Sequence, residues 1–118
     1  MMTNFRCEYG IVICDMIMNN ILNQIKDVVS AKEPTAKIML FGSRARGDAK
    51  EDSDWDIIIL LDKDRITSSD IDNISYPVRE LGWQIDAMIN PILYTQNEWK
   101  KKSFTPFYKN VMKEGIAI

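Results

Sequence analysis

The chain of 118 residues is 46% hydrophobic and 27% charged, which is typical of one folded globular domain and excludes an intrinsically disordered protein. Its formal net charge is −2, so it lacks the basic field that attracts nucleic acid, and nucleic acid is not expected as a partner. It contains no histidine, which excludes Cys/His zinc sites and the Ser-His and Cys-His nucleophile pairs.

We expect a single domain over residues 1–118 in the cytoplasm. Cys7 and Cys14 form no C-x-x-C pair, which indicates reduced thiols of a cytosolic protein. No segment reaches the ~20 apolar residues that a membrane span needs. The apolar stretch YGIVICDMIM contains Asp15 and lacks the flanks of a signal peptide.

The first half of the chain predicts one long helix and two strands. Apolar side chains recur at helical spacing over residues 11–31, which predicts a helix there. The segment KIMLFG predicts a short buried strand over residues 37–41. The segment WDIIILLD predicts a second strand over 55–61, because an unbroken apolar run is typical of a strand covered on both faces.

A helix and a third strand are predicted next. Ser68 or Ser69 can cap a helix that ends near Gly82, and Pro77 within it predicts a kink or a break. The segment WQIDAMIN alternates well enough to predict a strand over 83–89.

Two short helices complete the chain. Thr95 and Glu98 form a capping-box pattern that opens the first. Thr105 and Pro106 open the second, and Gly115 follows its end. The order α-β-β-α-β-α-α predicts an α/β (α+β) domain with a small mixed sheet flanked by helices.

Four D-x-D pairs occur in the sequence, and a solvated loop or a helix cap is the ordinary role of such a pair. Asp54 and Asp56 differ because they lead into the strand over 55–61, where period two places both side chains on one face. That face continues into Ile58 and Leu60, so the pair is expected at the edge of the core.

Asp86 is the one acid in the apolar segment predicted as the strand over 83–89. An isolated acid inside a strand needs either water or a partner. If this strand lies beside the one over 55–61, the carboxylates of Asp54, Asp56 and Asp86 converge. Such a cluster suits a divalent cation with oxygen ligands, most naturally Mg²⁺ together with substrate phosphates.

The step Gly42-Ser43 follows the strand over 37–41 and offers a site for an anion. Glycine permits close approach of the backbone, and Ser43 can open a short helical turn, SRAR, whose N–H groups favour phosphate. Arg44 and Arg46 can add further phosphate contacts. The alternative is an ordinary strand-to-turn step with solvated arginines.

Together these residues resemble a known family. In GSRARGDAKEDSDWDIIIL, the pattern of GS, ten residues and DWD is similar to the G-S-x10-D-x-D signature of DNA polymerase beta-like nucleotidyltransferases, most of all to their minimal nucleotidyltransferase branch. FYKNVMKEGIAI also resembles the way these small proteins end, so the resemblance covers nearly the whole chain. It implies transfer of a nucleoside monophosphate, AMP from ATP, to a hydroxyl group, with pyrophosphate leaving.

The resemblance also implies roles for individual residues. Asp54 and Asp56 would bind two Mg²⁺ ions. Asp86 falls where the family carries its third carboxylate, and it would bind the ion that activates the acceptor hydroxyl and take its proton. Such chemistry needs positioning and charge neutralisation more than a nucleophilic side chain, in agreement with a chain without histidine. The β- or γ-phosphate of the nucleotide would be held by the other residues of the motif, namely Gly42, Ser43 and Arg44 or Arg46.

Small members of this branch are often encoded beside a helical HEPN protein, a toxin ribonuclease, and act as its antitoxin by adding AMP to a tyrosine. The resemblance therefore implies a protein acceptor in trans. The expected contact surface is an aromatic and basic region near the C-terminus that comprises Trp99, Lys100, Lys101, Phe107 and Tyr108. Core packing is the alternative for these aromatic residues and is favoured for Trp99 and Phe107.

Two other functions are consistent with the sequence. One is a binding module that neutralises a partner without chemistry. The other is transfer to a small molecule such as an antibiotic, although the chain lacks the added helical acceptor domain of larger relatives. The acceptor, the preferred base and the oligomeric state are not determined by the sequence.

Overall fold

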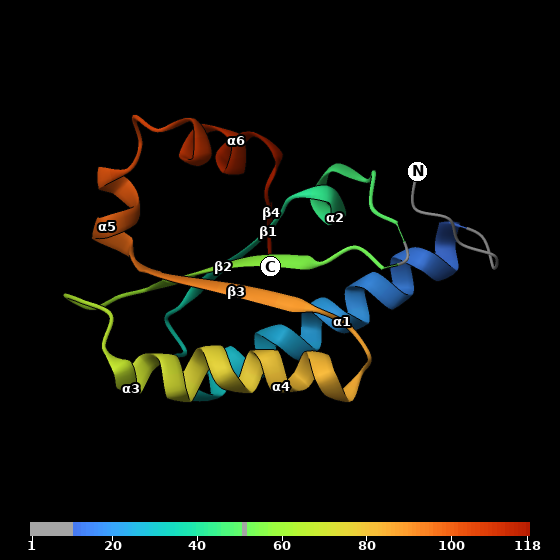
Figure 1. Ribbon diagram of the computed structural model, residues 1–118, viewed down its shortest axis with the longest axis horizontal. Coiled ribbons are helices and arrows are strands. Elements are labelled where there is room, and N and C mark those ends of the chain that lie inside the picture. Colours follow the sequence, from blue (N-terminus) through green and yellow to red (C-terminus); the bar gives the residue numbers. More distant parts are fainter. Residues whose placement is uncertain (1–10, 51) are drawn as a thin grey trace.

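The structure is a computed structural model that describes residues 11–50 and 52–118. The predictions for Cys7 and for the side chain of Cys14 lie outside what it describes. Within the two described ranges, no helix is both long enough and apolar enough to cross a membrane. The elements drawn in Figure 1 are α1 (Ile11–Lys32), β1 (Lys37–Phe41), α2 (Ser43–Arg46), β2 (Trp55–Leu61), α3 (Ser68–Asp70), a π-helical turn η1 (Ile71–Ser75), α4 (Tyr76–Gln84), β3 (Ile89–Thr95), α5 (Gln96–Lys101), α6 (Pro106–Glu114) and β4 (Ile116–Ala117).

The strands form one mixed sheet in the order β3-β2-β1-β4. β1 pairs antiparallel with β2 and with β4, and β2 pairs parallel with β3. A parallel pair needs a long crossover connection, which α3, η1 and α4 supply. The predicted α/β class, with a small mixed sheet flanked by helices, is confirmed.

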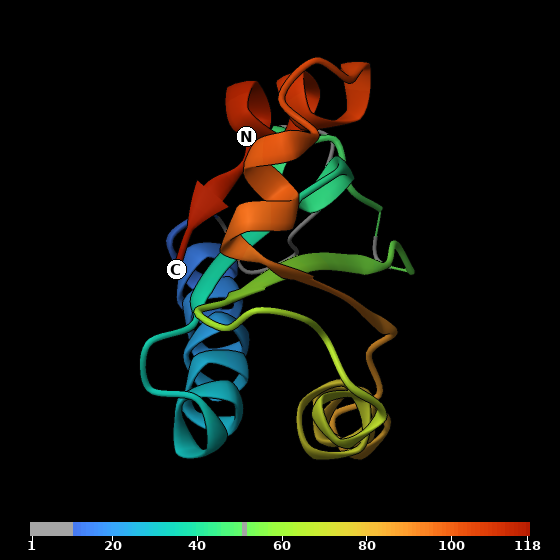
Figure 2. The same cartoon turned by 90° about the vertical axis from the view of Figure 1, so that its left-hand side faces the viewer.

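Helices cover both faces of the sheet, with α1 and α4 on one side and α5 and α6 on the other (Figures 1 and 2). The side chains of β2 alternate between the two cores that result. Ile57 and Ile59 pack with residues of α1 and α4, whereas Ile58 and Leu60 pack with residues of α5 and α6. This burial on both faces explains why residues 55–61 are apolar without alternation.

Several predicted elements are confirmed. The strands over 37–41 and 55–61 coincide with β1 and β2, and the helix over 11–31 is α1, which extends one residue further. The capping box at Thr95 starts α5, and Thr105 caps α6.

The helical segment that follows β2 starts and runs differently from its prediction. Its first cap is Thr67, not Ser68 or Ser69, and Thr67 forms a capping box with Asp70. The wider turn η1 precedes Pro77, which lies in the first turn of α4. Proline lacks an N–H and its ring crowds the preceding turn, so η1 is the irregularity that the sequence predicts at this place.

The predicted strand over 83–89 is wrong. α4 continues through Gly82 to Gln84, and β3 begins only at Ile89. Gly82 is needed inside the helix because a Cβ at this position would lie 2.5 Å from the carbonyl oxygen of Ala87. Gly82 therefore does not end the helix, as the sequence predicts, but allows α4 to pack closely against the turn that follows it.

Pro91 is the reason why the sequence does not predict β3, because proline cannot donate to a strand ladder and is normally excluded from central strands. β3 lies at one edge of the sheet and pairs with β2 alone. Pro91 lies opposite Ile57 in that pair. An edge strand has one side without a partner, and this position tolerates the missing N–H.

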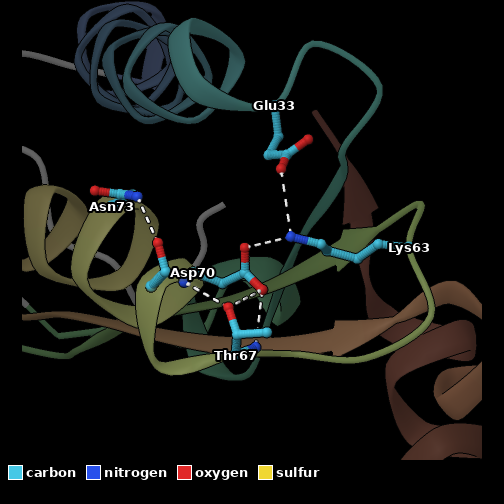
Figure 3. A network of polar contacts seen from close by, with 6 residues as sticks. Glu33, Lys63, Thr67, Asp70 and Asn73 are labelled. Atoms are coloured by element: carbon cyan, nitrogen blue, oxygen red, sulfur yellow. Dashed lines mark hydrogen bonds and ion pairs between the residues drawn. The ribbon is translucent and has the colours of Figure 1, made fainter.

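A polar network fixes the chain just beyond the C-terminal end of β2 (Figure 3). Lys63 Nζ donates to Asp70 Oδ1 at 2.6 Å and lies 3.9 Å from Glu33 Oε1. The backbone N–H of Thr67 donates to Asp70 Oδ2 at 2.8 Å. The network connects the residue after α1 to the start of α3. It lies beyond the C-terminal end of β2, whereas the motif acids lie at the N-terminal end.

Candidate active site

The Gly-Ser step and the acid pair meet where β1 ends and β2 begins. The antiparallel register places Phe41 opposite Asp56. Gly42 follows with φ 77°, and a Cβ on it would lie 2.5 Å from Asp56 Oδ2. Glycine alone combines this positive φ with room for the carboxylate, so the turn into Ser43 is held directly against Asp56.

Asp54 and Asp56 project from the same face of the chain, as period two predicts. Trp55, between them, is buried in the core formed with α1 and α4. Asp56 is half-buried and Asp54 is exposed. The two carboxylates therefore lie on the side of the sheet that α5 and α6 cover further along β2.

The pair carries an electrostatic cost. Burial raises the pKa of Asp56, and the charge of Asp54 raises it further, against the lowering effects of a hydrogen bond from Asn90 and of the charge of Arg46. A raised pKa means that the ionised form is disfavoured in the folded protein. A cation bound at this edge would relieve that cost.

Asn90 is a third polar side chain at this edge, which the sequence pattern did not indicate. The parallel register places Asn90 opposite Asp56. Its Nδ2 donates to Asp54 Oδ2 at 3.0 Å. The capping box at Thr95 is a sequence signal for the end of β3. Pairing Thr95 with Leu61, the last residue of β2, would have placed Asn90 opposite Asp56.

Asp86 lies elsewhere. It occupies the turn between α4 and β3, is exposed and has φ 57°, a conformation that aspartate tolerates better than most residues. Together with Trp55 and Trp83 it lines a groove of about 980 Å³ on the α1 and α4 side of the sheet. The predicted strand around Asp86 is absent, so its predicted role as a ligand beside Asp54 and Asp56 has lost its structural basis.

Arg44 is turned away from the site. It is buried, its guanidinium lies 4.5 Å from the centre of the Trp55 ring, and Nη2 donates to the carbonyl oxygen of Ser53 at 2.8 Å. Burial lowers its pKa, which the charges of Asp52 and Asp54 partly offset. Arg44 therefore holds the loop that leads to Asp54, and the alternative of a solvated arginine is wrong for this residue.

Arg46 is exposed and bridges two elements. Its Nε donates to Asp48 Oδ2 at 3.2 Å and its Nη1 to Glu114 Oε2 at 3.3 Å. Hydrogen bonds to both carboxylates raise its pKa. This arginine links α2 to α6 beside the acid pair, and its charge acts on Asp56.

The C-terminal aromatic residues pack on one another, and Trp99 and Tyr108 belong to the core that α5 and α6 form with the sheet. Trp99 is buried, and its ring lies 5.9 Å from that of Phe107 and 4.8 Å from that of Tyr108. The favoured alternative of core packing is thus confirmed for Trp99. Phe107 also packs on Phe41 but remains 37% exposed, and Phe104 is 77% exposed. The other residues of the predicted contact surface, Lys100 and Lys101, are exposed.

The donors at this edge suit Mg²⁺, which proteins commonly hold with one or two carboxylates while substrate phosphates and water supply the other ligands. Asp54 and Asp56 provide two carboxylates, and Asn90 provides an amide. Within residues 11–50 and 52–118, no group of three or more Asp, Glu, His or Cys side chains could hold a metal ion. The predicted convergence of three carboxylates is therefore not found there.

Comparison with known proteins identifies relatives that cover most of the chain. A family model described as "Nucleotidyltransferase domain" matches residues 22–118. Two proteins of Methanocaldococcus jannaschii, each named "Putative protein adenylyltransferase", are similar in sequence. One is 38% identical over 82 residues, which cover 70% of this chain and 76% of that protein. The other is 32% identical over 100 residues, which cover 83% and 95%.

Two solved structures share the fold. One is a crystal structure of a mutant of the toxin-antitoxin MntA-HpeT, with a TM-score of 0.57 and 21% identity, over 81% of this chain and 69% of that chain. The other is a crystal structure of a toxin-antitoxin with AMP-PNP, with a TM-score of 0.56 and 19% identity, over 80% and 69%. At these identities the similarity establishes the fold.

Proposed function

Because the chain belongs to the nucleotidyltransferase domain family, we propose that it transfers AMP from ATP to a hydroxyl group of another protein. The acceptor oxygen gives up its proton to water and forms a bond to the α-phosphorus, and pyrophosphate leaves with the electron pair of the broken P–O bond. The observation that carries the proposal is the edge where the Gly42 turn touches Asp56, beside Asp54. The names of the two archaeal relatives and the AMP-PNP in a structural neighbour support an adenine nucleotide and a protein acceptor.

Asp54 and Asp56 would hold the Mg²⁺ that accompanies the nucleotide. When bound, this ion supplies charge neutralisation for the phosphates and for the leaving pyrophosphate. β2 and the Gly42 turn fix the carboxylate of Asp56, and the amide of Asn90 orients that of Asp54. Both acids are thus in position before the substrate arrives, which is what phosphoryl-type transfer needs from a protein.

The phosphates would be held by the Gly42 backbone, Ser43 and Arg46. Arg46 is suited to this task because its ion pairs with Asp48 and Glu114 are at the surface, where such pairs contribute little and exchange easily. A guanidinium that leaves a carboxylate can bind phosphate oxygens with two parallel hydrogen bonds.

We further propose that the acceptor is a tyrosine of a HEPN toxin and that transfer makes this protein its antitoxin. The resemblance to the minimal nucleotidyltransferase branch supports this, as do structural neighbours that are toxin-antitoxin complexes. The acid pair lies on the face covered by α5 and α6, and Phe107 packs on Phe41, which lies opposite Asp56, so a protein that presents a hydroxyl there also meets Phe107. Lysines at the end of α5 add positive charge to this surface.

The test is incubation with ATP labelled at the α-phosphate, Mg²⁺ and the protein encoded by the neighbouring gene, which the proposal expects to be a HEPN protein. Label on a tyrosine of the HEPN protein, absent with Asp56→Asn, is the expected result. Asp72→Asn is the matched control, because Asp72 is an exposed acid of η1 on the other side of the sheet. Equal labelling by the wild type and by Asp56→Asn, or none by either on the HEPN protein and on the chain itself, would refute the proposal.

The second candidate is an antitoxin that binds its partner without chemistry. The exposed aromatic side chains of Phe104 and Phe107 favour it, because exposed apolar surface marks a site of protein binding and such binding needs no nucleotide. It predicts that Asp54→Asn and Asp56→Asn neutralise the toxin in cells as well as the wild type. A small-molecule acceptor would instead appear as antibiotic resistance conferred by the wild type and lost with Asp56→Asn.

A further inference from the structure

The side chain that faces the acid pair from the neighbouring strand is neutral. β2 and β3 run parallel, and the register sets Asn90 opposite Asp56. Asn90 Nδ2 donates to Asp54 Oδ2 at 3.0 Å, and a hydrogen bond from Asn90 also acts on Asp56. One amide therefore holds Asp54 by a hydrogen bond and lies opposite Asp56, on the strand that would have to carry a third acid.

Asp86 does not fill this gap. It precedes β3 and lies in a turn with φ 57°, and it lines the groove with Trp55 and Trp83 on the other face of the sheet. Strand alternation leads to the same conclusion, because Trp55 points away from the face that carries Asp54 and Asp56.

The difference between an amide and a carboxylate at this position is one of charge and of role. A carboxylate would add a third negative charge and could serve as ligand to a second cation. An amide adds no charge, and its NH₂ group can orient neighbouring carboxylates by hydrogen bonds. Two carboxylates together with nucleotide phosphates match the ordinary ligand set of one Mg²⁺ ion.

We propose that Asn90 is the third side chain of the cation site, that Asp86 has no part in it, and that the site holds one divalent cation firmly, the one that enters with the nucleotide. The inference rests on the proposed nucleotidyltransferase function. Asn90 is a positioning residue that acts through Asp54 and Asp56. The site therefore differs from the two-ion arrangement that the sequence motif implies.

The test counts Mn²⁺ ions by electron paramagnetic resonance. The full chain is mixed with an equal amount of the ATP analogue that carries a methylene group between the α- and β-phosphates, with the analogue alone as reference. We expect one tightly bound Mn²⁺ per chain for the wild type and for Asp86→Asn, and two for Asn90→Asp. Asn90→Ala should keep one, bound about 10–100-fold more weakly, as is typical when a side chain that orients a metal ligand is lost.

Two tight Mn²⁺ ions in the wild type with one in Asp86→Asn would overturn the inference, and so would a single ion in Asn90→Asp. Asn90→Asp is nearly isosteric, so it decides the question even if Asn90→Ala fails to fold. Asp56→Asn separates this inference from the proposed function. If Asp56→Asn binds Mn²⁺ as the wild type does, the acid pair is not a cation site and the proposed function fails first.

Discussion

Both ends of β2 lie close to aspartates, but the two ends differ in what neutralises the charge. Beyond the C-terminal end, Asp70 accepts hydrogen bonds from the ammonium group of Lys63 and from Thr67. At the N-terminal end, Asp54 accepts a hydrogen bond from the neutral amide of Asn90, and burial keeps the pKa of Asp56 raised although the charge of Arg46 opposes this shift. An acid with its own internal cation stabilises the fold, whereas an acid pair beside an amide is suited to a cation from outside.

This contrast predicts opposite responses to removal of an acid. At the N-terminal end of β2, function should suffer while stability is kept. At the C-terminal end, stability should suffer while function is kept.

Replacement of Asp56 by asparagine should reduce AMP transfer by about 100-fold or more, because it removes a charged ligand of the cation. The free energy of unfolding without metal should be unchanged or slightly higher, because a partly buried charge beside Asp54 is removed. Transfer of labelled AMP and urea unfolding, measured on the same preparation, check both parts. A clear loss of stability together with the activity would contradict the contrast.

Gly42→Ala should lower the free energy of unfolding by about 2 kcal/mol, since a positive φ alone costs a non-glycine residue ~1–2 kcal/mol. The added methyl group would also lie 2.5 Å from Asp56 Oδ2, so transfer should fall because the carboxylate is displaced. Gly47→Ala is the matched control, since Gly47 has φ 83° at the end of α2. It should lose stability but retain most of the transfer, and equal losses of transfer in the two variants would argue against a specific contact with Asp56.

Asp70→Ala should lower the free energy of unfolding by about 1–2 kcal/mol, because it removes half of the capping box with Thr67 and the partner of Lys63. Transfer by the folded protein should be unchanged, since Asp70 lies beyond the C-terminal end of β2 and the acid pair lies at its N-terminal end. A loss of transfer comparable to that of Asp56→Asn would contradict this prediction.

The smallest expected effect is a dependence on pH. Burial acts to raise the pKa of Asp70, but the hydrogen bonds from Lys63 and Thr67 outweigh it and leave the pKa lowered. A lowered pKa stabilises the folded state above the usual aspartate value of about 3.9, and this stabilisation is lost as the pH falls through the folded value. The difference in unfolding free energy between wild type and Asp70→Ala should therefore be constant near neutral pH and shrink below about pH 4. Urea unfolding at several pH values measures it, and a difference that grows on acidification would contradict the account.

The parts of the fold that depend on local signals could be predicted from the sequence. The apolar run of residues 55–61 specifies a strand buried on both faces, and the caps at Thr95 and Thr105 specify the starts of α5 and α6. In the candidate site, Gly42 lies against Asp56 because it directly follows Phe41, the residue that the antiparallel register places opposite Asp56.

The parts that depend on tertiary contacts could not be predicted. Gly82 remains inside α4 because the helix packs on Ala87, and Pro91 is tolerated because β3 has a free edge. Asn90 joins the acid pair through the register of a parallel strand pair. Arg44 turns toward Trp55, which the motif alone does not indicate.

The central claim is that Asp54 and Asp56 form the cation site of a nucleotide-binding edge, and thermal unfolding tests it most directly. Mg²⁺ with a non-hydrolysable ATP analogue should raise the Tm of the wild type, because a ligand at 100 times its Kd adds about 2.7 kcal/mol to the stability of the folded state. The analogue with Mg²⁺ should have little effect on Asp56→Asn, while Asp72→Asn should respond as the wild type does. A Tm that does not respond in the wild type, or that responds equally in Asp56→Asn, would contradict the account.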